Sequence, residues 1–307
     1  MDIVHDFILW LEAERRYSPL TVRNYRRDVC DLLRWKGMTP ESFDPEKIDR
    51  TDIEEWMEYL YDVRGLKTSS VNRTIASIRS FWHWMVSHNI TSKDITKQIH
   101  RHKQPRRLPT FVPDQHMRGI VERMREDISS TDFEPLRNAL IIMLLYSAGL
   151  RLSEIVAANI EDVASDYSTI RVVGKGDKMR LQPITTFVGK IIKKYFSLIF
   201  SQNICTGRKN ALILSKKGER ISRRTVQRIV DNILKEEGVQ GRTSPHVLRH
   251  TFATHLLVEG CDLREIQELL GHSSLRATQV YTHVDIRKLQ EIYTTAHPRG
   301  ADNDPAL

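Results

Sequence analysis

Six residues of this 307-residue chain have side chains suited to a reaction at a phosphodiester. They are Arg151, Lys175, His246, Arg249, His272 and Tyr281. Arginines can hold the non-bridging oxygens of a phosphate and stabilise charge in the transition state, and a lysine can protonate a departing oxygen. A histidine can take or return the proton of a tyrosine hydroxyl, whose ordinary pKa is about 10. The set predicts Tyr281 as a nucleophile that attacks phosphorus.

Each of the six residues lies in a distinctive local sequence. Arg151 follows Ala-Gly-Leu, and Lys175 lies between two glycines in an expected turn. His246 and Arg249 are three residues apart in a segment expected to be helical, so they share a face. Taken singly, each residue type is far more often structural or solvated, and the Gly-Lys-Gly turn lacks the spacing of a P-loop. The combination is what favours catalysis.

The sequence indicates no metal site. It has no cluster of carboxylates that could hold Mg²⁺, which argues against a two-metal nuclease. Its three cysteines, Cys30, Cys205 and Cys261, are far apart and form no C-x-x-C pair. Neither a zinc site nor a disulfide framework is expected. We therefore expect no metal and no cofactor.

Composition and the first residues favour a protein of the reducing cytoplasm. The chain is 40% hydrophobic and 28% charged, which is typical of globular proteins. Its start, from Met1, has early acids and no basic region of the kind that opens a signal peptide. The longest apolar run, residues 139–146, is too short to cross a membrane and is expected to be a buried helix.

A formal net charge of +8 favours a polyanionic partner, because neutralised phosphates release their counterions. Residues 95–113 carry three prolines, no acid and a run of positive charge. The DNA-binding candidates there are Arg101, Lys103, Arg106 and Arg107. Prolines keep such a segment extended, which suits a strand that lies along phosphates. A solvated linker without a partner is the alternative.

Hydrophobic spacing indicates helices throughout residues 2–88. Ser18 is expected to be an N-cap before Pro19, and Thr51 with Glu54 has the spacing of a capping box. Later in the chain, helices are expected at 136–146 and from about Ser153.

Residues 168–184 predict two strands around a turn at 174–177. The elements together predict a mainly α protein of two domains. We expect a helical N-terminal domain at 1–95, a basic proline-containing linker at 96–113, and a mixed α+β catalytic domain with a small β-sheet at 114–307.

The order and contexts of the six residues resemble the tyrosine recombinases of the phage integrase family. The segments 246–257 (HVLRHTFATHLL), 269–272 (LLGH) and 278–284 (TQVYTHV) are similar to the Xer subgroup. The resemblance covers essentially the whole chain, including an N-terminal domain of the size that Xer proteins use to clamp DNA. Ala148 stands where a threonine is usual and Ala158 where a leucine is common, and neither is a catalytic position.

The resemblance implies a role for each matched residue. Tyr281 would form a 3′-phosphotyrosyl link, Arg151 and Arg249 would bind the scissile phosphate, and Lys175 would protonate the 5′ oxygen. His246 would be a general acid and base, His272 would hydrogen-bond a phosphate oxygen, and Glu154 would orient these groups. The basic segment 215–228 lies near DNA in the family, which makes Arg223 and Arg224 further candidates for DNA binding. A solvated helix is the alternative for that segment.

The implied activity is conservative recombination of double-stranded DNA at short inverted-repeat sites. The implied shape is a C-shaped clamp, and the implied assembly is a tetramer of this chain or of this chain with a paralogous recombinase. In Xer proteins this activity resolves chromosome dimers. A septal DNA translocase is a candidate activator. Three alternatives stay open: an integrase of a mobile element, a type IB topoisomerase, and a DNA-binding regulator without catalysis. The complete set of six residues argues against the regulator, which has no need of Tyr281.

Overall fold

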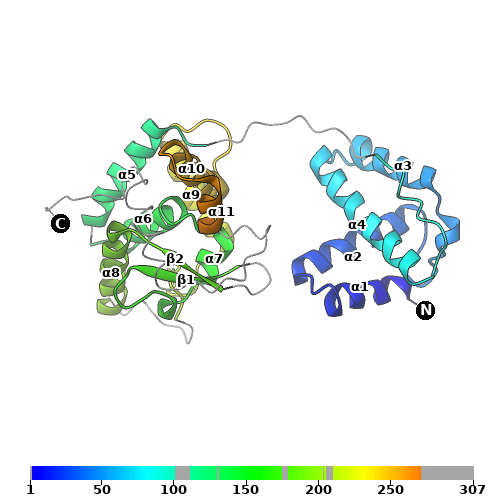
Figure 1. The fold of residues 1–307 in the computed structure, drawn as a ribbon, viewed down its shortest axis with the longest axis horizontal. Helices are drawn as coiled ribbons and strands as arrows, with labels where there is room; N and C mark the ends of the chain where they lie inside the picture. The colour runs from blue at the N-terminus through cyan, green and yellow to red at the C-terminus, as the bar shows by residue number, and fades with distance from the viewer. Residues whose placement is uncertain are drawn as a thin grey trace. The chain divides into compact units, whose positions relative to one another are not determined.

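The computed structural model describes residues 2–100, 111–129, 131–174, 179–202, 204 and 210–270. The chain divides into two compact units, Met1–Arg107 and Leu108–Leu307 (Figure 1). Each unit has its own buried apolar core. In these residues helices predominate and the two strands form one sheet, so the expected mainly α fold class with two domains is confirmed. None of the described helices is long and apolar enough to cross a membrane.

Within residues 2–100, four α-helices build the first unit. They are α1 (Ile3–Ala13), α2 (Pro19–Trp35), α3 (Arg50–Glu58) and α4 (Thr68–Ser87), with a 3-10 turn at Pro45–Lys47 and a π-helical turn at Tyr59–Val63. The predicted start of α2 is confirmed. The Ser18 side chain accepts a hydrogen bond from the Thr21 N–H, and Pro19 occupies the first helical position, where it needs no N–H partner.

The start of α3 differs from the prediction. Its N-cap is Asp49, whose carboxylate accepts a hydrogen bond from the Asp52 N–H at 2.9 Å. The Asp52 carboxylate in turn accepts one from the Asp49 N–H at 3.0 Å. Thr51 lies inside the first turn, so the capping box expected at Thr51 and Glu54 is wrong. Aspartate caps a helix at least as well as threonine, and here it comes two residues earlier.

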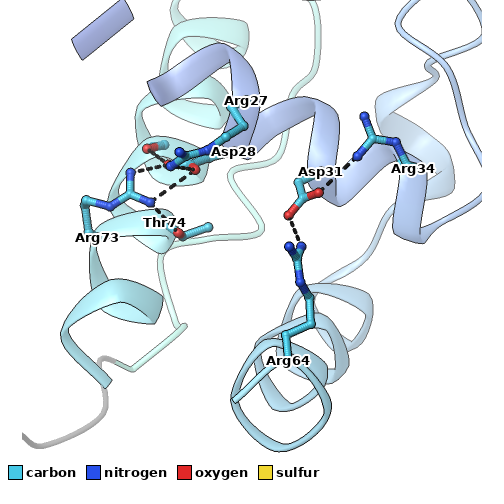
Figure 2. A network of polar contacts seen from close by, with 8 residues as sticks. Arg27, Asp28, Asp31, Arg34, Arg64, Arg73 and Thr74 are labelled. Atoms are coloured by element: carbon cyan, nitrogen blue, oxygen red, sulfur yellow. Dashed lines mark hydrogen bonds and ion pairs between the residues drawn. The ribbon is translucent and has the colours of Figure 1, made fainter. Parts of the chain in front are cut away.

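A buried carboxylate joins α2 to α4. Asp28 is 3% exposed and accepts hydrogen bonds from Arg73 Nη1 at 2.7 Å and from the Ser77 hydroxyl at 2.8 Å (Figure 2). Arg27 pairs with the same carboxylate at 3.1 Å. Without this carboxylate the buried Ser77 hydroxyl would lose its acceptor, which typically costs about 1–3 kcal/mol. The next turn of α2 carries Asp31 and Arg34, which form a more exposed ion-pair group with Arg64, the residue after the π-helical turn (Figure 2).

The second unit is built around α6. Its described elements are α5 (Asp114–Ser129), α6 (Phe133–Tyr146), α7 (Leu152–Ala157), a 3-10 turn (Ile160–Asp162), β1 (Thr169–Val173), β2 (Met179–Pro183), α8 (Thr186–Ser201), α9 (Arg223–Glu236), α10 (Pro245–Val258) and α11 (Leu263–Leu270). Helix α6 packs against α5, α8 and α10. Residues 139–146 are buried throughout, as the apolar run predicts, although the helix starts three residues before the predicted 136.

The predicted hairpin is confirmed as an antiparallel pair of β1 and β2. In its register, Val172 lies opposite Arg180 and Ile170 lies opposite Gln182. Residues directly opposite each other in such a pair point to the same face. Val172 and Ile170 are buried, so this face of β2 turns a guanidinium and an amide toward the interior, whereas Leu181 on the other face is 41% exposed.

The described residues before α5 are held by α10. The backbone N–H of Val112 donates to the Thr251 hydroxyl at 2.9 Å, and that hydroxyl donates to the carbonyl of Val247 at 2.8 Å. Val112 and Thr251 are both fully buried. The entry to the second unit is therefore fixed to the same helix that carries His246 and Arg249.

Candidate active site

The turn between α6 and α7 determines where Arg151 lies. Gly149 in this turn has a φ of 59°, a conformation that favours glycine. A Cβ added at this position would lie 2.6 Å from the ring of Phe252, so only glycine allows α10 to pack this closely. The chain then enters α7 with Arg151 at the N-cap position. Glycine at position 149 is thus required by packing as well as by the backbone.

Glu154 in the first turn of α7 is the centre of a buried ionic cluster. Its side chain is 1% exposed. One carboxylate oxygen accepts a hydrogen bond from Arg151 Nη1 at 2.7 Å, and the other accepts one from the Arg151 backbone N–H at 2.8 Å. The carboxylate therefore fixes both the backbone and the guanidinium of Arg151.

Helix α10 brings Arg249 to the same carboxylate. Arg249 Nη1 lies 3.9 Å from Glu154 Oε2, and the guanidinium donates hydrogen bonds to the carbonyls of Gly149 and Leu270. Arg249 is 8% exposed. His246 lies one turn earlier on α10, after Pro245 at the first helical position, and its side chain is exposed. The structure thus brings Arg151, Glu154 and Arg249 together and places His246 on the adjoining turn.

The pKa values of Glu154 and Arg249 are both lowered from their ordinary values. Burial acts to raise the pKa of Glu154, but the hydrogen bonds and charge of Arg180 and the hydrogen bonds of Arg151 hold it at about 2. Burial, with the charges of Arg151 and Arg180, lowers the pKa of Arg249 to about 10, against the opposing charge of Glu154. Both Glu154 and Arg249 are therefore ionised near neutral pH.

Three of the six predicted residues, Lys175, His272 and Tyr281, lie outside the described residues, as do Arg101, Lys103, Arg106 and Arg107. Arg223 and Arg224 are described and exposed at the start of α9, after the N-cap Ser222. A hollow of about 570 Å³ is lined by Arg224 and by Pro245 at the start of α10. It connects the first turn of α9 with the end of α10 that carries His246. Nowhere in the described part of the chain do three or more His, Cys, Asp or Glu side chains group to hold a metal ion.

Two family profiles together match most of the chain. The profile described as phage integrase family matches residues 115–288, and that of the phage integrase N-terminal SAM-like domain matches residues 4–89. The chain belongs to the phage integrase family. The cluster around Glu154 and both catalytic arginine candidates lie within the first of these matches.

Curated relatives of this phage integrase family member are tyrosine recombinases. Tyrosine recombinase XerC of Pelobacter propionicus is 36% identical over 306 residues, which cover 99% of this chain and 98% of the relative. Tyrosine recombinase XerD of Oceanobacillus iheyensis is 35% identical over 303 residues, which cover 97% and 98%. The resemblance to tyrosine recombinases of the Xer subgroup is thereby confirmed.

Solved structures of the family share the fold. XerH site-specific recombinase, in a post-cleavage complex with palindromic difH substrate, matches with a TM-score of 0.68 and 23% identity over 90% of this chain and 80% of that one. A lambda integrase dimer bound to a COC′ core site matches with a TM-score of 0.62 and 17% identity over 90% and 98%. At these identities the likeness shows the fold alone.

In this phage integrase family member, sequence reasoning missed Arg180. Its guanidinium donates to both oxygens of Glu154, at 2.8 and 3.0 Å, and its side chain is 9% exposed. A signal for it was present in the hairpin. Once Val172 and Ile170 are taken as the buried face of β1, the antiparallel register places Arg180 and Gln182 on that face too.

Arg220 has a different use from the one its basic segment suggests. Its Nη1 donates to the carbonyls of Val156, Ala157 and Ala158, at 2.8, 3.0 and 2.9 Å. These are carbonyls at the C-terminal end of α7, where a helix leaves acceptors unsatisfied and where positive charge is favourable. Arg220 therefore caps the short helix whose other end carries Arg151.

Proposed function

We propose that this chain is a site-specific recombinase that cuts and rejoins double-stranded DNA through a 3′-phosphotyrosyl link on Tyr281. The observation that carries the proposal is the convergence of Arg151 and Arg249, from different elements, on the buried carboxylate of Glu154. A fixed pair of guanidinium groups suits the two non-bridging oxygens of a phosphodiester. Full-length similarity to named tyrosine recombinases supports the assignment.

In the proposed reaction Arg151 and Arg249 bind the scissile phosphate and stabilise its developing charge. The Tyr281 oxygen attacks phosphorus and gives its proton to His246, while the bond from phosphorus to the 5′ oxygen breaks and Lys175 protonates that oxygen. His272 donates a hydrogen bond to a phosphate oxygen. One phosphoester replaces another, so the energy of the broken bond is retained and no ATP is needed. The step is a transesterification like that of type IB topoisomerases.

The proposed DNA contacts come from both units. Arg101, Lys103, Arg106 and Arg107 would follow the backbone from a linker at 96–113, between a clamp domain at 1–95 and a catalytic domain at 114–307. Arg223 and Arg224 would add contacts at the start of α9, where exposed arginines and helix N–H groups favour a phosphate. The partner DNA would carry two short inverted repeats, and four protomers, identical or paralogous, would assemble on two such sites.

Among the roles open to this chemistry, we propose Xer-type resolution of chromosome or plasmid dimers in the cytoplasm, with a septal DNA translocase as candidate activator. Full-length relatives named XerC and XerD support this role. Integration of a mobile element uses the same chemistry and is the alternative. The two are distinguished by whether the gene lies alone in the chromosome or beside element genes with a flanking attachment site.

The test uses a nicked duplex that carries an inverted-repeat site, selected from random-sequence DNA by the protein itself. Tyr281→Phe should abolish the denaturant-resistant covalent complex and leave binding of the site nearly unchanged, since one hydroxyl contributes little affinity. Tyr293→Phe, another tyrosine in the C-terminal part of the chain, is the control and should still form the complex. A covalent complex formed by Tyr281→Phe would show that another residue is the nucleophile.

A further inference from the structure

Strand β2 carries a guanidinium on a face where the neighbouring strand carries core residues. Arg180 lies opposite Val172, which is 2% exposed, and Gln182 lies opposite the fully buried Ile170. Gln182 is itself 1% exposed, and its Oε1 accepts a hydrogen bond from Arg180 Nε at 3.3 Å. A buried charge is tolerated only where it is paired and hydrogen-bonded. The contacts that Arg180 makes therefore explain why an arginine lies here.

The two terminal nitrogens of Arg180 are both directed at one carboxylate, that of Glu154. Arg180 Nη1 donates to Glu154 Oε1 at 2.8 Å and Nη2 donates to Oε2 at 3.0 Å, which is the two-pronged geometry of a strong arginine–carboxylate pair. Each oxygen of Glu154 thus receives one bond from Arg180 and one from Arg151. With both oxygens bonded in this way, the carboxylate has one orientation, and Arg249 meets Oε2 in that orientation at 3.9 Å.

We propose that Arg180 is a positioning residue for the phosphate-binding pair. It fixes Glu154 in the orientation that aligns Arg151 with Arg249, and it joins strand β2 to the same carboxylate. This inference rests on the proposed function. Arg180 takes no part in bond making; it holds the groups that do.

Charge supports the same role. Glu154 faces three cationic groups from three elements, namely Arg151 of the α7 N-terminus, Arg180 of β2 and Arg249 of α10. Burial favours the neutral form of this carboxyl, and Arg180 is the largest single opposing influence on its pKa. Without Arg180 the pKa of Glu154 would rise, and the carboxyl would become protonated as the pH falls. A protonated Glu154 attracts Arg151 and Arg249 less strongly.

The experiment compares Arg180→Gln and Arg180→Lys with a matched control on the same hairpin. Arg171→Gln removes an arginine of β1 that pairs with Asp162 at 2.8 Å and is 49% exposed, on the opposite face. For each variant we would measure thermal unfolding, affinity for the selected site, and single-turnover cleavage of the nicked duplex between pH 5.5 and 8.5. The wild-type chain serves as reference.

We expect Arg180→Gln to cut the cleavage rate about tenfold or more, as lost positioning does, with affinity for the site changed by about twofold or less. The cleavage rate of Arg180→Gln should also decrease at low pH, and by more than the cleavage rate of the wild type does. Arg180→Lys should show a smaller defect, because it keeps the charge and loses the fork. Arg171→Gln should cleave like the wild type. The double variant Arg180→Gln with Glu154→Gln should lack this additional decrease at low pH, because the carboxyl of Glu154 is no longer there to be protonated.

Two results would overturn the proposal. One is cleavage by Arg180→Gln at the wild-type rate across the pH range. The other is a parallel loss of folding, DNA affinity and cleavage in both Arg180→Gln and Arg180→Lys, which would make Arg180 a purely structural ion pair. Failure of the proposed function looks different, because the wild type itself would then form no covalent complex.

Discussion

Arg151, Arg180 and Arg249 surround a single buried carboxylate, that of Glu154. Three positive groups and one negative group leave this cluster with a net charge of +2. Buried charges of one sign are costly, and a bound anion relieves that cost. A phosphodiester brings one negative charge, so the cluster is matched to it in sign. The excess charge is therefore a property suited to binding and costly to folding.

At the residue scale, the role of Lys175 can be tested by changing the leaving group. Lys175→Ala should slow cleavage of an ordinary duplex by about 10²–10⁴, the usual contribution of general acid catalysis. A 5′-bridging phosphorothiolate at the scissile bond should restore the rate, because sulfur departs without a proton. Single-turnover cleavage of the two substrates measures this. Lys178→Ala, which changes a lysine three residues later in the sequence, is the control and should cleave the two substrates at similar rates. If Lys175→Ala slowed cleavage of both substrates equally, Lys175 would position DNA and would not protonate the leaving oxygen.

At the element scale, the sequence predicted what local signals determine. Ser18 before Pro19 sets the start of α2, and the alternation of residues 168–184 sets the hairpin. The start of α3 was mispredicted because Asp49 and Thr51 are both good caps and a linear pattern does not rank them. Of the candidate site, residue types and contexts were predictable. The contact of Arg180 with Glu154 was not, because it joins residues 26 apart that only the tertiary structure brings together.

Arg220 shows how a basic residue can serve a helix rather than DNA. Arg220→Ala should lower the free energy of unfolding by about 1–3 kcal/mol, because three carbonyls at the end of α7 lose the hydrogen bond from its guanidinium. Of the three, the Ala158 carbonyl still accepts from the Leu212 N–H. Denaturant titration measures this. The salt dependence of DNA binding should stay unchanged. Arg223→Ala, three residues later and exposed, is the matched control: it should leave stability within about 0.5 kcal/mol and reduce the salt slope by about 1. A reduced salt slope in Arg220→Ala would count against the capping role.

At the scale of the whole molecule, two independently packed units share one chain with a net charge of +8. DNA binding by both units at once raises affinity through their effective concentration, and each phosphate contact adds a counterion term. The predicted linker, residues 96–113, carries five lysines and arginines and no acid. Its contribution should be electrostatic and independent of sequence.

Reversing Arg106 and Arg107 to glutamate should weaken binding of the selected site and of random DNA by similar factors. The slope of log affinity against log salt should fall by about 2, near one for each phosphate that is no longer neutralised. Fluorescence anisotropy at several salt concentrations measures both effects. Lys193→Glu combined with Lys235→Glu makes the same change in net charge on α8 and α9 and should leave the slope nearly unchanged. An unchanged slope in the Arg106 and Arg107 variant would indicate that the segment is a solvated linker that does not contact DNA.

The hydrogen bond from the Val112 N–H to the Thr251 hydroxyl determines where a separate catalytic fragment should begin. A fragment that starts at Asp114, the first residue of α5, would omit a fully buried valine and leave the buried Thr251 hydroxyl with an acceptor site unfilled. The vacancy would lie against α10, within one turn of Arg249. A separately expressed catalytic fragment should therefore begin before Val112. The helix boundary is the wrong place to cut, because the core of the second unit includes Val112, which precedes its first helix.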